Sequence, residues 1–194
     1  MIQILKINRK NNSANILLSN DTIIVLSLEL VCFELLYEGL EITEEHLDYL
    51  LKKDKVLAAK NSLFNKLSIK YLSLKESTSF LYSKKLSDED IHLIIDDFVQ
   101  KGYINDYKYV VSYLDIKKKM EGPLLLKHKL LAKGIKENLI NDIINNIDIN
   151  EWIKTVYDYY NLDSVLDYKK AYNKLYTKGF LYSDIINLIG GFNY

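Results

Sequence analysis

Few residues in this chain could do chemistry, and their spacing assembles neither a catalytic site nor a metal site. Its three histidines, His46, His92 and His128, lack the short spacings that helical metal ligands use, and its one cysteine, Cys32, lies in an apolar run. We expect the histidines on helix surfaces and Cys32 as a small core residue. The pattern predicts a protein that is not an enzyme and binds no metal or cofactor.

Two acidic clusters and a glycine pair also have simple structural explanations. The acids at 88–90 and 96–97 fall in predicted helices, where adjacent side chains point to different faces and acids near a helix start complement its dipole. Gly190-Gly191 lacks the Lys-Ser/Thr tail and the preceding strand of a phosphate-binding loop. None of these patterns predicts a ligand.

The most informative charged feature is a lysine-rich stretch between residues 108 and 136. It holds eight lysines against Asp115 and Glu121, a local excess of six positive charges in a chain of zero net charge. A solvated lysine face would explain this excess, and so would a footprint for an acidic partner, either DNA backbone or an acidic protein groove. The candidate contacts are Lys117, Lys118, Lys119, Lys127, Lys129 and Lys133.

Tyrosines at 103, 107, 109 and 113 lie beside these lysines and could stack on bases. We expect most of them to pack inside the protein, since the chain has 16 tyrosines to place. The 26 basic and 26 acidic residues exclude nucleic-acid binding through bulk charge, and Arg9 is the single arginine.

The start of the chain does not resemble a secretory signal, because Lys6, Arg9 and Lys10 interrupt its apolar residues. The longest apolar stretch, residues 23–36, contains two glutamates and is too short to span a membrane. A single cysteine fits a reducing compartment. We therefore expect a cytoplasmic protein without membrane contact.

The elements that must position these residues begin with a small sheet. Short β-branched runs at 2–7, 16–18 and 22–26, separated by Asn, Asp and Ser, predict an antiparallel meander. Leu28, Val31, Leu35 and Leu36 predict a covering helix that Gly39 ends. Thr43 and the acids after it then predict the start of a second helix.

From residue 56 onward the pattern is helical, and it repeats three times. The segments 81–91, 130–140 and 175–185 share a leucine, a lysine three residues later and an isoleucine ten residues after the leucine. The match extends to an apolar residue at Phe98, Ile147 and Phe192.

Each repeat predicts a helix that ends at its lysine, followed by a tight turn. Gly134 and Gly179 can adopt the left-handed conformation that closes a helix, whereas Lys85 occupies this place in the first repeat. An apolar residue, Leu86, Ile135 or Phe180, then packs under the turn. Ser87 and Ser183 are the predicted caps of the following helices in the first and third repeats.

An additional helix precedes each pair, at 56–72, 107–119 and 152–161. The predicted fold is mainly α, with three tandem three-helix repeats forming an elongated curved body behind a small β-containing head. The predicted domains are 1–55 for the head and 56–105, 106–149 and 150–194 for the repeats.

Three motifs resemble the RecX family of bacterial recombination regulators. Gly102-Tyr103-Ile104-Asn105-Asp106 resembles the family's hallmark between the first two repeats. Gly122-Pro123, with the segment 130–135, is similar to its second-repeat helix, and 174–180 to its last repeat. Residues 71–73 resemble the end of a first-repeat helix. The resemblance covers about residues 56–192, and the head resembles that of longer Gram-positive members.

The resemblance implies a regulator of RecA-dependent recombination, DNA repair and the SOS response. It implies binding along the RecA–DNA filament, inhibition of RecA, and weak contact with single- or double-stranded DNA. We expect a monomer. Two alternatives stay open: a helical DNA-binding protein that acts without RecA, and a helical-repeat scaffold for another protein.

Overall fold

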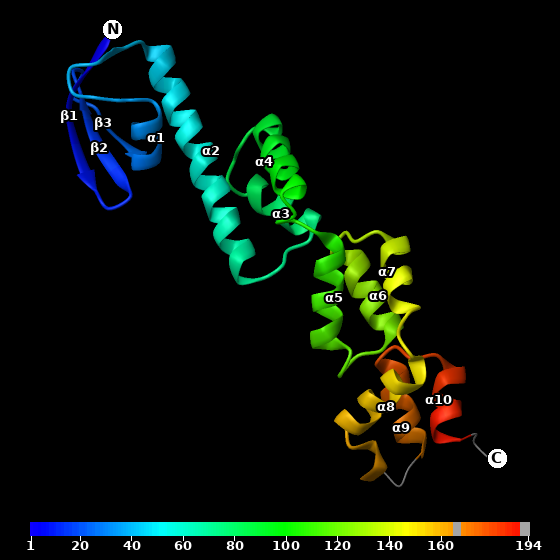
Figure 1. The fold of residues 1–194 in the computed structure, drawn as a ribbon. Helices are drawn as coiled ribbons and strands as arrows, with labels where there is room; N and C mark the ends of the chain where they lie inside the picture. The colour runs from blue at the N-terminus through cyan, green and yellow to red at the C-terminus, as the bar shows by residue number, and fades with distance from the viewer. Residues whose placement is uncertain (165–167, 191–194) are drawn as a thin grey trace. The chain divides into compact units, whose positions relative to one another are not determined.

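The computed structural model describes residues 1–164 and 168–190, which form a mainly helical protein with a small sheet near the N-terminus (Figure 1). Ten α-helices, four β-strands and one short 3-10 helix, η1 (Leu162–Ser164), occur among the described residues. The chain divides into two compact units, residues 1–66 with 81–94, and residues 67–80 with 95–194. The predicted mainly α class with a β-containing head is confirmed.

The sheet of the first unit is antiparallel, with the strand order β3-β2-β1-β4. Its strands are β1 (Ile2–Lys10), β2 (Ser13–Leu18), β3 (Ile23–Ser27) and β4 (Glu41–Ile42). The first three form the predicted meander, with alternate side chains such as Ile16 and Leu18 buried. The two-residue strand β4 was not predicted, because it is too short to show a periodic pattern.

Helix α1 (Leu28–Phe33) packs Leu30 and Val31 into the core that the sheet forms. The prediction that this helix continues to Gly39 is wrong, since it ends at Phe33 and Leu35 has a φ of +52°. Cys32 is exposed, so its prediction as a core residue is also wrong. A helix of six residues turns only its two central apolar positions toward the sheet.

Helix α2 (Glu44–Ile69) is one helix of 26 residues, where the sequence predicted two. Thr43 caps it as predicted, since its hydroxyl accepts a hydrogen bond from the His46 amide at 3.1 Å. Lys55 Nζ donates to the Lys85 carbonyl at 2.5 Å within the first unit. The predicted boundary at residue 55 thus falls inside a continuous helix, and the division into domains stays a prediction.

The remaining helices follow in quick succession, and α5 and α8 match two of the predicted additional helices within a few residues. They are α3 (Leu74–Tyr82), α4 (Asp88–Gln100), α5 (Asp106–Lys117), α6 (Pro123–Ala132), α7 (Glu137–Ile144), α8 (Ile149–Tyr159), α9 (Tyr168–Thr177) and α10 (Tyr182–Ile189).

The repeated apolar positions are core positions, as the repeat predicted. The shared leucines and isoleucines are buried in all three repeats: Leu81, Leu130, Leu175, Ile91, Ile140 and Ile185. Those of the second and third repeats belong to one core that α5–α10 build together. Phe98 is buried too, whereas Phe192 lies outside the described residues.

The predicted turns at the helix ends are present. Gly134 and Gly179 have φ values of +81° and +94°, and Lys85 adopts +55° in the first repeat. The amides of Ile135 and Phe180 donate back to the carbonyls of the repeat leucines at 3.2 and 3.3 Å, the pattern of a glycine-closed helix end. Both side chains are buried under the turns, as predicted.

The two predicted caps have different outcomes. Ser87 is confirmed, because its hydroxyl accepts a hydrogen bond from the Asp90 amide at 3.2 Å. Ser183 is wrong, because α10 already begins at Tyr182 and Leu181 occupies the cap position without a side-chain hydrogen bond. The serine lies inside the first turn, two residues after the cap position.

Candidate partner-binding surface

Three of the six candidate lysines lie on α6 or at its end, and all three form ion pairs within the fold. Lys127 Nζ lies 2.7 Å from Glu137, Lys129 Nζ 2.7 Å from Glu121, and Lys133 Nζ 2.6 Å from Glu76. None of these lysines is fully exposed. Their charges are balanced internally, which reduces what they offer to a partner.

The other three candidates, Lys117, Lys118 and Lys119, lie at the end of α5 and in the turn after it. Lys118 forms an ion pair with Asp115 at 3.4 Å. The pair is exposed, and exposed ion pairs contribute little to the stability of the fold. Lys117 and Lys119 form no ion pair with any residue that the structure describes. Lys108 and Lys136 of the lysine-rich stretch also form no ion pair among the described residues, but this turn is the part of the stretch where three lysines are consecutive.

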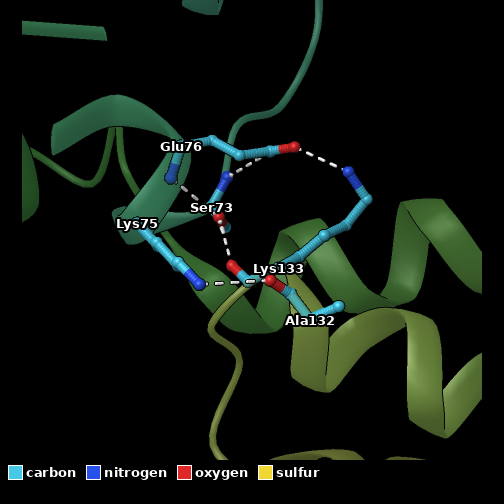
Figure 2. A network of polar contacts seen from close by, with 5 residues as sticks. All are labelled: Ser73, Lys75, Glu76, Ala132 and Lys133. Atoms are coloured by element: carbon cyan, nitrogen blue, oxygen red, sulfur yellow. Dashed lines mark hydrogen bonds and ion pairs between the residues drawn. The ribbon is translucent and has the colours of Figure 1, made fainter. Parts of the chain in front are cut away.

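Lys133 is part of a network that joins the start of α3 to the end of α6 (Figure 2). Ser73 and Glu76 form a capping box, in which the Ser73 hydroxyl accepts from the Glu76 amide and the Glu76 carboxylate accepts from the Ser73 amide, both at 3.1 Å. The same hydroxyl donates to the Lys133 carbonyl at 2.8 Å, and Lys75 Nζ donates to the Ala132 carbonyl at 3.3 Å. The capping box thus clamps the closing turn of α6.

The ionisation of this network follows from its contacts. The hydrogen bond to Glu76 raises the pKa of Lys133 to about 12. Partial burial acts to raise the pKa of Glu76, but the hydrogen bonds from Lys133 and from the Ser73 amide outweigh it, so that pKa lies below its usual value. Burial raises the pKa of Tyr109, which lies beside the pair. Both charges of the pair are fully formed near neutral pH.

We call the contact between the start of α3 and the closing turn of α6 the first joint. A second joint in the same unit uses the corresponding positions of the repeat. The Gly122 amide donates to the Lys178 carbonyl at 2.7 Å, and the Leu124 amide donates to the Gly179 carbonyl at 3.1 Å. Gly122 and Lys178 take the places in the repeat that Ser73 and Lys133 hold in the first joint. In both joints, the start of one helix holds the closing turn of a later one.

Sequence comparisons connect the chain with regulatory proteins, although no family model matches it. It is 25% identical to the "Regulatory protein RecX" of Clostridium tetani, over 97% of this chain and 91% of the relative. It is 27% identical to that of Streptococcus uberis, over 76% of this chain but only 58% of the longer relative.

Solved structures show the same fold. A crystal structure of regulatory protein RecX matches 97% of this chain and 98% of its own, with a TM-score of 0.68 and 20% identity. The structure of RecX from Lactobacillus salivarius matches 71% of this chain and 96% of its own, with a TM-score of 0.61 and 26% identity. In both sequence and fold, the chain is therefore similar to proteins named as the regulatory protein RecX.

The RecX-like motif at 102–106 has a structural role in this protein. Gly102 adopts a φ of +71°, and the Asn105 side chain caps α5 by accepting from the Lys108 amide at 3.0 Å. Asp106 accepts a hydrogen bond from the Leu74 amide at 2.9 Å, next to the capping box. The motif therefore sets the start of α5 and ties it to the start of α3.

The tyrosines near the RecX-like motif are divided between core and surface. Tyr109 is buried and stacks on Tyr113, with ring centres 6.1 Å apart, while Tyr103 packs edge-on against Phe98. Tyr107 is exposed. Tyr103 is also exposed and Tyr113 is partly buried, so the prediction that most of these rings pack inside holds for only two of the four.

Sequence reasoning missed one feature of the third repeat. Lys174 and Lys178 lie one turn apart and place their Nζ atoms 4.3 and 4.7 Å from the centre of the Tyr160 ring. The repeat spacing could have revealed them, because they correspond to Lys129 and Lys133. They were not predicted as contact residues, because nearby acids in the sequence balance their charge.

Two further observations concern metal binding and membrane spans. The described part of the chain holds no group of three or more His, Cys, Asp or Glu residues placed to share a metal ion. Within residues 1–164 and 168–190, none of the helices has both the length and the apolar character that crossing a bilayer requires.

Proposed function

We propose that this protein modulates the RecA recombinase as an inhibitor, by binding along the RecA–DNA filament in the cytoplasm. The observation that carries the proposal is this similarity, which extends over 97% of the chain in both a sequence relative and a solved structure. The RecX name of these proteins and the regulator implied by the sequence motifs support the same role. A monomeric regulator with repeated helical units could contact several protomers of one filament.

The lysine turn at 117–119 is the proposed contact with the acidic surface of the filament. Lys117 and Lys119 have no ion pair among the described residues, and the Lys118 pair is exposed, so these charges can meet a partner without breaking internal contacts. Lys127, Lys129 and Lys133 are weaker candidates, because a partner would compete with carboxylates at 2.6–2.7 Å. Direct DNA contact by this turn would be secondary and sensitive to salt.

The test is ATP hydrolysis by the cognate RecA on single-stranded DNA, with co-sedimentation of the purified protein on RecA filaments. We expect the wild type to lower ATP hydrolysis and to sediment with the filaments. A variant with Lys117, Lys118 and Lys119 all changed to Ala should bind several-fold more weakly. An unaltered ATPase and no sedimentation at micromolar wild type would contradict the proposal.

A matched control changes Lys6, Lys10 and Lys154 to Ala. These three lysines are exposed and have no ion pair among the described residues, so the control loses the same charge elsewhere. Equal weakening by both triple variants would show that net charge, rather than the turn, mediates binding. Binding to bare DNA that falls steeply with salt, without any effect on RecA, would favour an independent DNA-binding protein.

A further inference from the structure

The second unit has an open groove between the segment 67–72 and helix α5, and its lining includes Asp115, the ion-pair partner of Lys118 in the lysine turn. It consists of two hollows of about 620 and 420 Å³ that share Tyr71, Ser112 and Ile116 in their walls. The clamped pair of Glu76 and Lys133 lies in the wall of the larger hollow. The joint between α3 and α6 therefore holds one side of the groove in place.

Large apolar side chains around this groove are exposed to solvent. Ile69 is 84% exposed and Ile116 63%, while Tyr107 and Tyr71 are 56% and 49% exposed. Single exposed apolar residues are common, but four around one groove form the kind of patch that marks an interaction site. A partner that covered them would remove apolar surface from water.

The unbalanced charge of the groove is positive. Glu76 is paired with Lys133, and Asp115 is paired with Lys118. The two remaining charged side chains of the lining, Lys70 and Lys108, form no ion pair within the part of the chain that the structure describes. Charge complementarity therefore favours an acidic occupant.

The apolar lining favours a polypeptide over a single-stranded nucleic acid. Bases bind such surfaces by stacking on free aromatic faces, but Tyr109 is buried and stacks on Tyr113, which leaves Tyr71 and Tyr107 as the exposed rings of the lining. The most exposed apolar groups, Ile69 and Ile116, are aliphatic and have no ring on which a base could stack. Aliphatic and aromatic side chains of a peptide fit this lining better.

We propose that this groove binds an acidic polypeptide segment that carries apolar side chains. The apolar residues of the segment would cover Ile69, Tyr71 and Ile116, and its carboxylates would pair with Lys70 and Lys108. This inference goes beyond regulation of RecA, because it depends only on the chemistry of the groove.

The test uses a fluorescein-labelled peptide of twelve residues, Asp-Leu-Glu-Phe repeated three times, and fluorescence anisotropy with the full-length protein. We expect saturable binding in the micromolar range. A peptide of Asp-Ser-Glu-Ser repeats, a peptide of Lys-Leu-Lys-Phe repeats and a twelve-nucleotide oligo(dT) should each bind at least about tenfold more weakly.

Two double variants test the two parts of the recognition. Lys70→Glu with Lys108→Glu, and Ile69→Ser with Ile116→Ser, should each weaken binding of the acidic apolar peptide about tenfold. Their matched controls in the head, Lys6→Glu with Lys10→Glu and Ile23→Ser with Val25→Ser, change similarly exposed residues and should bind as the wild type does. Circular dichroism would show that all four variants retain their helices.

Absent binding of the acidic apolar peptide, or equal binding by the Asp-Ser-Glu-Ser peptide, would overturn the proposal. So would unchanged binding by the groove variants, or tight oligo(dT) binding that depends on Ile69 and Ile116. If the wild type binds the peptide but has no effect on RecA, the proposed function is contradicted and the proposal for the groove is supported. The two failures are therefore distinguishable.

Discussion

Helices α6 and α9 carry a lysine pair at the same place in the repeat, yet the two pairs have different partners. Lys129 and Lys133 meet Glu121 and Glu76 at 2.7 and 2.6 Å. Lys174 and Lys178 lie over the ring of Tyr160 instead, and no carboxylate pairs with them among the described residues. The repeat determines where the lysines lie, whereas residues outside the repeated pattern determine whether their charge is available.

The two joints differ in the same way. In the first, a serine side chain and a carboxylate hold the turn at Lys133 and Gly134, and a Cβ on Gly134 would lie 2.6 Å from Lys75 Cδ. In the second, backbone amides hold the turn, and a Cβ on Gly179 would lie 2.5 Å from the Leu125 nitrogen. A joint made of side chains can adjust to a change, whereas a joint made of backbone has little freedom to do so.

The largest expected effect is therefore that of Gly179→Ala. The alanine would adopt a φ of +94° and press against the backbone of Leu125, which together should cost about 3–5 kcal/mol. Gly134→Ala should cost less, about 2–3 kcal/mol, because Lys75 Cδ can move away, although Lys75 Cβ at 2.7 Å from the new Cβ can give way only through a small backbone shift. Urea unfolding followed by fluorescence of Trp152, the single tryptophan, would measure both, since its ring packs edge-on against Phe180.

Gly102→Ala is the control for the glycines, because Gly102 has a φ of +71° and nothing lies within 4 Å of its would-be Cβ. It should show only the cost of backbone strain, about 1–2 kcal/mol. If Gly179→Ala destabilised the protein no more than this control, the contrast between the joints would be wrong.

The next-largest expected effect is a difference in stability between variants that lack one or the other lysine pair. Lys129→Ala with Lys133→Ala should cost about 2 kcal/mol, because it leaves Glu121 and Glu76 partly buried without their cations. Lys174→Ala with Lys178→Ala should cost about 1 kcal/mol, since it removes only cation–π contacts with the partly buried Tyr160 ring and leaves no carboxylate without its cation. Urea unfolding monitored at Trp152 would compare the two, and equal losses would contradict the proposed difference.

A smaller effect concerns the acid dependence of the first joint. Because the folded pKa of Glu76 lies below its ordinary 4.5, its pair with Lys133 stabilises the protein above that pH and is lost as the pH falls through the folded pKa. The raised pKa of Lys133, about 12, preserves the pair up to its ordinary 10.5 and beyond. Glu76→Gln should lower the free energy of unfolding by about 1 kcal/mol at pH 7. The stability of this variant should also fall less steeply than that of the wild type as the pH is lowered.

Unfolding of the wild type and Glu76→Gln at pH 7 and at pH 3–4 would measure this effect. Glu137→Gln is the matched control, because Glu137 pairs with Lys127 at 2.7 Å but is exposed and belongs to no joint. A Glu76→Gln variant with the acid dependence of the wild type would show that the pair contributes nothing to the joint.

The sequence alone predicted the elements that depend on local signals. The helix-closing turns follow from the conformational freedom of Gly134 and Gly179, and the buried leucines follow from the helical spacing of the repeat. The joints could not be predicted, because Ser73 and Lys133 are 60 residues apart and a capping box gives no sign of a second partner. Cys32 was misplaced because an apolar run alone does not show which face of a short helix is buried.

For the same reason, the lysine-rich stretch could be located but not interpreted in detail. Counting charges along the chain treated Lys129 and Lys133 as available, although Glu121 precedes the first by eight residues and Glu76 precedes the second by 57. The partners of a charge depend on the tertiary fold. The turn at Lys117–Lys119 retains its charge because no distant carboxylate reaches it within the described residues.

The smallest expected effect is a gain in stability from Lys85→Gly, which gives the first repeat the Lys-Gly turn of the other two. Lys85 adopts a φ of +55°, a strain of about 1–2 kcal/mol for a residue with a side chain. Glycine removes that strain but adds freedom to the unfolded chain, so the net gain should be about 0.5 kcal/mol. The bond from Lys55 uses the backbone carbonyl and would remain. Urea unfolding followed by circular dichroism would measure the gain, and Lys84→Gly, one residue earlier with ordinary φ, should instead destabilise. If both variants lost stability alike, the left-handed turn at Lys85 would carry no strain.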